Sequence, residues 1–262
     1  MFSLQHILFD MKTDHVGLIT LNRPHAANAL SIEMLKELQA VIDVIESNPT
    51  IRVVVLTGSG EKAFCAGADL KERKAMNEFE VLQTVKLIGE TANKLENLSV
   101  PVIAGINGVA FGGGLEFSLA CDIRIAANHA KVGLTETSLA IIPGAGGTQR
   151  LPRLIGVGKA KRLIYTASRL NAKEAYELGI VEEIVANEDL LTTAVDLASK
   201  IAENGPIAIK QAKKSINKGL EVDLQTGLEI EHLSYQHTIH TKDRLEGLQA
   251  FSEKRKPLYK GE

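Results

Sequence analysis

Two glutamates stand in strongly apolar stretches of the sequence. Glu116 follows a run of three glycines (112–114) and is flanked by Leu115 and Phe117, while Glu136 precedes the apolar run 139–143. A carboxylate in such surroundings is destabilising unless it is paired or its pKa is raised. Two semi-buried carboxylates at one reaction centre could therefore act as general acid and general base. For either glutamate alone, a capping or salt-bridging role is the alternative.

Three segments rich in glycine and alanine accompany these glutamates, at 63–69, 107–116 and 142–150. Glycines allow a ligand to approach the backbone, and the first turn of a helix leaves N–H donors without partners. Two such donors from different loops would form an oxyanion hole, which suits a thioester oxygen that gains negative charge. Neither GxGxxG after a strand nor GxxxxGK[ST] occurs, which argues against a nucleotide-binding loop. The glycine count alone would equally fit close packing.

The other reactive side chains form no recognisable site. His232, His237 and His240 do not share one helical face with a carboxylate, so we expect no metal site. No GxSxG sequence is present, which excludes the nucleophile elbow of serine hydrolases. Cys65 and Cys121 are too few for a disulfide framework and show no CxxC spacing. We interpret them as buried small hydrophobic residues and expect a reducing, cytoplasmic location.

The elements that must position these segments alternate between strands and helices. A hairpin is predicted at 5–10 and 15–21, and Ser31 is a plausible N-cap for an amphipathic helix that ends near Asn48. The runs 51–56 and 101–106 are typical of strands buried on both faces, which indicates a parallel sheet. We further expect a helix at 79–98, a short helix at 115–121, a strand at 122–127 and an irregular segment at 131–143. The remainder is mainly helical.

Length and composition set the domain organisation. The chain has 262 residues, of which 45% are hydrophobic and 24% are charged, as in ordinary globular proteins. We divide it into an α/β core at 1–200 and a C-terminal helical region at 201–262. The helical region has too little apolar surface to close a core of its own, so we expect it to pack on the core or on another subunit. No signal peptide or bilayer-spanning stretch is expected.

Charge argues against a polyanionic partner. Thirty Lys and Arg against 32 Asp and Glu give a net charge of −2, so there is no global basic field. The most concentrated basic surface is one predicted helical face with Lys210, Lys213, Lys214 and Lys218. We interpret it as a solvated face, and binding of a nucleic acid is not expected.

Taken together, the glycine-rich segments and the stretches 21–24, 28–30 and 251–255 resemble the crotonase superfamily, the enoyl-CoA hydratases and isomerases. The resemblance spans essentially the whole chain. Segments 136–144 (ETSLAIIPG) and 241–248 (TKDRLEGL) look most like the methylglutaconyl-CoA hydratases. The resemblance implies a spiral of repeated ββα units with a C-terminal helical region, assembled as a homotrimer or homohexamer. It also implies a place in fatty-acid or branched-chain amino-acid breakdown.

The catalytic residues are carried over by position. Ala68 and Gly113 match the two backbone N–H donors to the thioester oxygen, and Glu116 and Glu136 match the two catalytic glutamates. Family members that only move a double bond commonly lack the residue matching Glu116, so the resemblance implies addition of water to a 2-enoyl-CoA. Which glutamate is the acid stays open. No resident cofactor is implied, because CoA arrives as part of the substrate.

The resemblance also implies contacts to the CoA part of the substrate. The matching positions are Arg23, Ala26, Ala66, Asp69, Leu70, Lys71, Pro143 and Gly144. Phe251 and Lys254 match C-terminal positions that reach the CoA site of a neighbouring subunit. These assignments follow from the family pattern and not from spacing.

Three alternatives and one specific substrate remain. An isomerase, an inactive scaffold and an RNA-binding protein share this fold, and the methylglutaconyl-CoA group is associated with RNA binding. The acidic first amphipathic helix, 31–46, argues against RNA, and the presence of both glutamates argues against a scaffold. 3-Methylglutaconyl-CoA is one hypothesis for the substrate, beside a generic short-chain 2-enoyl-CoA. Its terminal carboxylate would need a cation, for which Arg150 or a lysine of the stretch 71–74 is a candidate.

Overall fold

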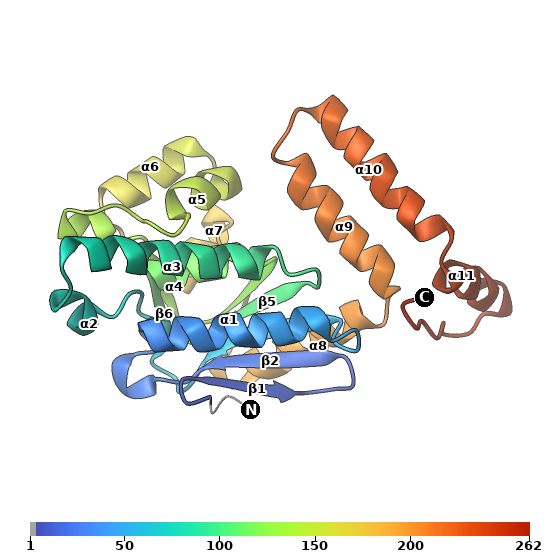
Figure 1. Ribbon diagram of the computed structural model, residues 1–262, viewed down its shortest axis with the longest axis horizontal. Coiled ribbons are helices and arrows are strands. Elements are labelled where there is room, and N and C mark those ends of the chain that lie inside the picture. The colour runs from blue at the N-terminus through green and yellow to red at the C-terminus, as the bar shows by residue number, and fades with distance from the viewer. Residues whose placement is uncertain (1–3) are drawn as a thin grey trace.

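A six-stranded sheet forms the centre of the computed structural model, which describes residues 4–262 (Figure 1). Its strand order is β1-β2-β3-β5-β7-β10, and every pair is parallel except β1 with β2. The strands are β1 (Ile7–Met11), β2 (Val16–Leu21), β3 (Val53–Gly58), β5 (Val102–Ile106), β7 (Ile123–Ala127) and β10 (Glu183–Val185). The predicted hairpin and the buried parallel strands are therefore confirmed.

A second sheet of four short strands lies beside the first. It contains β4 (Ala63–Cys65), β6 (Val109–Phe111), β8 (Lys131–Gly133) and β9 (Leu170–Asn171), in the order β4-β6-β8-β9. Three times the chain leaves a strand of the large sheet, adds a strand to the small sheet and enters a helix or helical turn. This repetition confirms the α/β spiral of ββα units. Strands of two or three residues are too short to show alternation in the sequence, which is why the glycine loops were not predicted to contain them.

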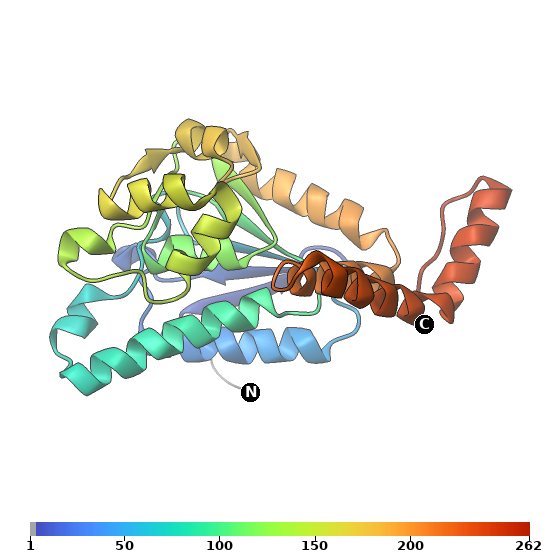
Figure 2. The same ribbon diagram turned by 90° about the horizontal axis from the view of Figure 1, so that it is seen from above.

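Helices cover both faces of the large sheet. On one face α1 (Ile32–Ser47) and α3 (Glu78–Glu96) run side by side, and Figure 2 shows α8 (Leu190–Ala202) on the opposite face. Ser31 caps α1 by accepting a hydrogen bond from the Met34 N–H, as predicted. Alternate residues of β3 divide between the two cores, with Val54 facing the α1 side and Val55 facing α8. Burial of β3 on both faces of the sheet explains why the sequence has a mostly apolar run at 51–56.

Shorter helices and turns complete the core. These are α2 (Leu70–Lys74), α4 (Gly113–Ala120), α5 (Gly147–Ile155), α6 (Val157–Tyr165) and α7 (Ala172–Leu178), with 3-10 turns η1 (Pro24–Ala26), η2 (Glu136–Leu139) and η3 (Asn187–Asp189). Helix α4 begins two residues before the predicted position, because tertiary packing overrides the low helix propensity of glycine. A Cβ on Gly114 would lie 2.0 Å from the Cys65 carbonyl oxygen. The segment 131–143, predicted to be irregular, contains β8 and η2.

The last sixty residues form a helical arm that extends away from the core (Figures 1 and 2). This C-terminal arm, residues 203–262, contains α9 (Pro206–Gly219), α10 (Leu224–Ile239) and α11 (Lys242–Glu253). Only Ser234, Asp243 and Ala250 are buried in it. Helix α8 still packs on the large sheet, so the chain leaves the core between Ala202 and Pro206. Most of the arm is thus left uncovered by residues 4–262 of the single chain.

The predicted basic face of the arm is interrupted in the structure. The Lys213 side chain is only 8% exposed, and its ammonium group donates to Asp122 Oδ2 at 2.8 Å and to the Val100 carbonyl at 3.0 Å. Lys218 pairs with Glu221 on the same side of the arm. The prediction of four solvated lysines was wrong for Lys213, because the pairing of its charge depends on where α9 meets the core. None of the helices in residues 4–262 is both long and apolar enough to cross a membrane.

Candidate active site

A cavity of about 310 Å³ opens beside the glycine-rich segments of all three ββα turns. Its walls come from α2, α3, the start of α4 and the loop around η2. Both glutamates selected from the sequence line it. The predicted site residues that line this cavity are Ala66, Ala68, Leu70, Gly113, Glu116, Glu136 and Gly144. Segments distant in the sequence are therefore brought to one place.

Two unpartnered backbone N–H groups lie side by side at the cavity wall. Gly113 is the first residue of α4, and Ala68 follows Gly67 in the loop after β4. Within residues 4–262, neither the Ala68 N–H nor the Gly113 N–H donates to a protein acceptor. Gly67 has φ +94°, and a Cβ there would lie 3.3 Å from the Gly113 nitrogen and 2.8 Å from the Phe111 oxygen. Only glycine brings the two donors this close, as an oxyanion hole requires.

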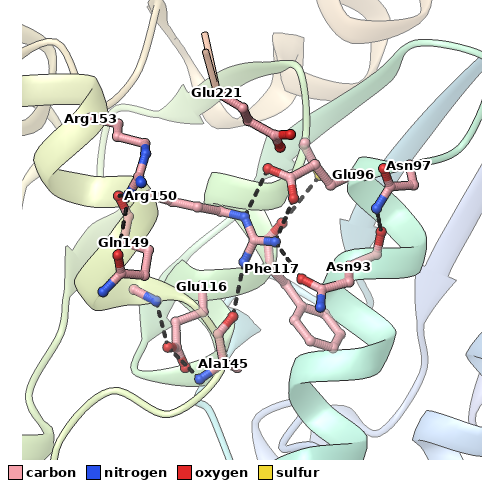
Figure 3. A network of polar contacts seen from close by, with 12 residues as sticks. Asn93, Glu96, Asn97, Glu116, Phe117, Ala145, Gln149, Arg150, Arg153 and Glu221 are labelled. Atoms are coloured by element: carbon pink, nitrogen blue, oxygen red, sulfur yellow. Dashed lines mark hydrogen bonds and ion pairs between the residues drawn. The ribbon is translucent and has the colours of Figure 1, made fainter. Parts of the chain in front are cut away.

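Glu116 is held in one orientation by the backbone of a neighbouring loop. Its side chain projects from α4 and the residue is 3% exposed. Oε1 accepts hydrogen bonds from the Ala145 and Gly147 N–H groups, each at 2.8 Å (Figure 3). Burial raises the pKa of Glu116 above its ordinary value, and these two bonds and the charge of Arg150 offset only part of that rise. Two donors to one carboxylate oxygen favour the ionised form.

The carboxyl group of Glu136 differs from that of Glu116 in its hydrogen bonding. Glu136 begins η2, and its Oε2 is buried without a hydrogen-bond partner in the described part of the chain. Burial, with the negative charge of Glu116 as a further cause, raises the pKa of Glu136 to about 7. A Cβ on Gly112 would lie 3.0 Å from Glu136 Oε1, so this carboxyl group lies against the glycine run that leads into α4. The two donors on Glu116 Oε1 stabilise its ionised form, whereas Glu136 Oε2 has no such donor, so Glu136 is the better candidate for the acid and Glu116 for the base.

Several predicted CoA contacts do not line the cavity. Among them are Arg23 and Asp69, whose side chains bind each other at 2.9 Å. Arg23 also donates to the Ala29 carbonyl, and Asp69 Oδ1 caps α2 by accepting from the Lys71 N–H. These bonds fasten the loop 22–29 to the segment that carries Ala68. Ala26, Lys71 and Pro143 are also absent from the cavity lining.

The two C-terminal positions are far from the cavity of their own chain. Phe251 and Lys254 lie at the end of α11, and Phe251 is 86% exposed. Figure 1 shows α11 and α2 at opposite ends of the molecule. Within one subunit, neither residue reaches the cavity.

Much of the remaining wall was not predicted from the sequence. It is formed by Arg73, Val85, Ile88, Phe111, Thr135, Ser138, Leu139, Ile141, Ile142, Ala145 and Arg169. One sequence signal could have identified part of this wall, because Val85 and Ile88 are one helical turn apart. The hydrophobic character of the loop 139–142 was also visible in the sequence, but its exposure was not. The Arg169 guanidinium lies 5.0 Å from the centre of the Phe111 ring, a contact that no local pattern shows.

The cysteines are buried, as predicted. Burial raises the pKa of both thiols, Cys65 and Cys121, to about 12, so they are protonated at neutral pH. In residues 4–262 no group of three or more His, Cys, Asp or Glu side chains is placed to hold a metal ion.

Comparison with known proteins gives a consistent result. The family model described as enoyl-CoA hydratase/isomerase matches residues 11–262. The chain is 64% identical to the protein YngF of Bacillus subtilis over 255 residues, which cover 97% of this chain and 98% of that protein. It is 48% identical to the mitochondrial methylglutaconyl-CoA hydratase of Mus musculus, over 96% of this chain and 82% of the relative. The crystal structure of an enoyl-CoA hydratase from Bacillus anthracis superposes with a TM-score of 0.98 at 60% identity, covering 98% of this chain and all of that one.

Proposed function

This chain belongs to the enoyl-CoA hydratase/isomerase family, and from that premise we propose that it is a hydratase that adds water across the double bond of a 2-enoyl-CoA thioester. One observation carries the proposal. A single cavity is lined by two carboxyl groups, one that accepts two backbone hydrogen bonds and one with an unpartnered oxygen, and by two unpartnered N–H donors. The presence of Glu116 as well as Glu136 supports hydration over simple movement of a double bond.

The proposed step uses each of these groups once. Ionised Glu116 accepts a proton from water as the water oxygen bonds to the β-carbon, and the thioester oxygen takes up negative charge. The Ala68 and Gly113 N–H groups stabilise that charge, because they are fixed in place and unpartnered. Glu136 then donates its proton to the α-carbon. The product is the 3-hydroxyacyl thioester, and transfer of one proton from Glu116 to Glu136 through solvent restores the starting state.

A direct assay tests the hydratase proposal. Addition of water removes the conjugation between the double bond and the thioester, so ultraviolet absorbance falls as the substrate is consumed. We expect the purified protein to consume crotonyl-CoA without any added cofactor. Absence of turnover with every short-chain and branched 2-enoyl-CoA would contradict the proposal.

We propose that the CoA part of the substrate lies across the loop 22–29 and the start of α2. Ala66, Leu70 and Gly144 line the cavity, and the Ala66 N–H donates to the Ala27 carbonyl, which joins the loop 22–29 to the segment that leads into α2. Ala26 and Lys71 are near neighbours of these residues in the chain. Because CoA enters with the substrate, the proposal needs no resident cofactor. Cys65 and Cys121 are buried and form no disulfide in the described residues, which supports a cytoplasmic location.

The cavity offers two cations to a carboxylated acyl group. Arg73 from α2 and Arg169 from the loop before β9 both line it. Neither forms an ion pair with a carboxylate in residues 4–262. Arg150, a candidate from the sequence, is not in the lining, because its guanidinium is bound to Glu96. An arginine without a carboxylate partner fits a diacid substrate, and the mouse methylglutaconyl-CoA hydratase at 48% identity supports 3-methylglutaconyl-CoA.

Arg73→Met is expected to lower kcat/KM for 3-methylglutaconyl-CoA by about 10–100-fold and to leave crotonyl-CoA turnover nearly unchanged, because a charge-assisted hydrogen bond of about 1.5–3 kcal/mol is lost only with the diacid. Lys74→Met, an exposed neighbour on the same helix, is the matched control. A large preference of the unmodified protein for crotonyl-CoA would eliminate the diacid substrate and leave the hydratase activity in place.

We propose that a second copy of the chain covers the C-terminal arm. Its exposed large apolar side chains are Ile216, Leu220, Val222, Leu224, Leu228, Leu233, Tyr235, Leu245, Leu248, Phe251 and Leu258. So many exposed large apolar side chains on one arm are typical of a protein interface. The family resemblance supports a homotrimer or homohexamer, and we propose that Phe251 and Lys254 reach the CoA site of a neighbouring subunit in it.

Light scattering at working concentration is therefore expected to give the mass of a trimer or hexamer. The double variant Leu220→Glu and Leu224→Glu, at positions 77% and 79% exposed, is expected to shift the protein to smaller species, because two carboxylates would have to be desolvated in the interface. A fully active monomer of the unmodified protein would contradict the prediction.

A further inference from the structure

Arg150 is the most extensively bonded side chain near the cavity, although it does not line it. It lies on α5 and its side chain is 13% exposed. Nε and Nη2 donate to Glu96 Oε1 and Oε2 at 3.0 and 2.6 Å, and Nη2 also donates to Asn93 Oδ1 at 2.7 Å. The fourth bond runs from Nη1 to the Ala145 carbonyl oxygen at 3.0 Å. The guanidinium thus connects α3 to the loop that precedes α5.

That loop is the one that holds Glu116. The Ala145 carbonyl accepts from Arg150, while the Ala145 N–H donates to Glu116 Oε1 on the other side (Figure 3). Gly146 between the two has φ +105°, and a Cβ there would lie 2.1 Å from Arg150 Nη1. A Cβ on Gly147 would lie 3.0 Å from Glu116 Oε1. The loop is therefore clamped between a guanidinium on one side and a carboxylate on the other.

We infer that Arg150 is a positioning residue for Glu116, an inference that rests on the hydratase function proposed above. By holding the Ala145 carbonyl, it fixes the two N–H donors that pin Oε1. The other carboxylate oxygen, Oε2, has no hydrogen bond to a protein donor among residues 4–262 and is free to meet a water molecule. Arg150 itself touches no reacting atom.

The charge of Arg150 has a second effect on the same carboxyl group. It opposes the rise in the pKa of Glu116 that burial causes. Other charged groups near this carboxyl are Glu136 of η2 and, in the cavity lining, Arg73 of α2 and Arg169 before β9. Figure 3 also shows Glu221, from the turn after α9, beside Glu96 and Arg150. From α3, Glu96 lies behind Arg150, and β4 and β6 contribute no charged residue. Arg150 is thus a cation bonded directly to the loop whose two N–H groups donate to Glu116.

Arg150→Gln is expected to lower kcat by about 10–100-fold with little change in KM, because misplacement of a catalytic group affects the chemical step. Loss of the positive charge raises the pKa of Glu116. The base is then protonated up to a higher pH, so the acid limb of the pH profile of kcat/KM moves to higher pH. Arg150→Lys keeps the positive charge, so the acid limb of this variant is expected near the position seen in the unmodified protein. Only part of kcat should be recovered, because one ammonium group cannot form all the bonds that the guanidinium forms with Glu96, Asn93 and Ala145.

Two further variants separate positioning from general stability. Glu96→Gln leaves the cation in place and removes its counter-charge, so its acid limb is expected to stay or move to lower pH. Arg153→Gln, an exposed arginine of the same helix bonded only to Gln149, is the matched control and should change neither kcat nor the profile. Folding of each variant is checked by circular dichroism and its thermal midpoint.

The inference is overturned if folded Arg150→Gln retains normal kcat and an unmoved acid limb, or if Glu96→Gln moves the limb upward as far as Arg150→Gln does. Titration of ¹³C-labelled glutamate carboxyls, with the Glu116 signal assigned by its absence in Glu116→Gln, provides a readout without turnover. An upward shift of the Glu116 midpoint in Arg150→Gln supports the inference even if the protein hydrates no enoyl-CoA. Failure of the hydratase proposal and failure of this inference are thereby distinguished.

Discussion

Glu116→Gln and Glu136→Gln are each expected to lower kcat by about 10²–10⁴-fold, because each removes one general acid or base from the proposed step. Binding of CoA should be largely unaffected. The glutamine oxygen at position 116 can still accept the two N–H bonds that Glu116 Oε1 accepts at 2.8 Å, so the loop is expected to keep its place. Consumption of a 2-enoyl-CoA followed in the ultraviolet provides the measurement.

The control for these variants is Glu90→Gln. Glu90 is exposed on α3, where it pairs with Lys86 at 3.7 Å, and its loss should leave turnover unchanged. Near-normal turnover in either catalytic variant would exclude the two-glutamate mechanism.

The environment of Glu136 adds a pH dependence to the same prediction. Its pKa is raised to about 7, and the proposed acid must carry its proton to act. Activity in the hydration direction is therefore expected to fall as the pH rises through this value, which gives an alkaline limb near neutrality in kcat/KM. The residual activity of Glu136→Gln should lack that limb.

Gly113→Pro is expected to abolish turnover. Proline removes the N–H donor at the cavity wall and places ring atoms beside the thioester oxygen. Gly113 is the first residue of α4, a position where proline is compatible with a helix because its N–H has no helical acceptor. The loss should therefore come from the missing donor and not from unfolding, which circular dichroism would verify.

Gly113→Ala is the matched variant, since it keeps the N–H. Its Cβ would lie 3.1 Å from Leu30 Cδ1, the end of a flexible side chain, so a modest reduction in turnover is expected. Full activity of correctly folded Gly113→Pro would show that this donor is not used.

The sequence by itself determined five of the six strands of the large sheet, the cap of α1 and the two glutamates of the cavity. It did not predict β10, which lies in the part of the chain expected to be mainly helical. The features that it determined are local. Continuous apolar runs indicate strands buried on both faces, Ser31 caps the turn that follows it, and glycine-rich segments mark places of close backbone approach. Glu116 and Glu136 stood out as carboxylates in apolar stretches, whereas Ala68 and Gly113 were assigned from the resemblance to the crotonase superfamily. The structure places all four in the lining of one cavity.

Tertiary structure decided the small sheet, the partner of each charge and the identity of the cavity cations. Strands of two or three residues form because neighbouring strands offer hydrogen bonds, and no local pattern encodes them. Arg150 looked like a candidate for the cavity but binds Glu96, and Lys213 looked solvated but binds Asp122, whereas Arg73 and Arg169 line the cavity. A long charged side chain pairs with whatever group the fold brings within its reach, so its role depends on contacts between segments that are distant in the sequence.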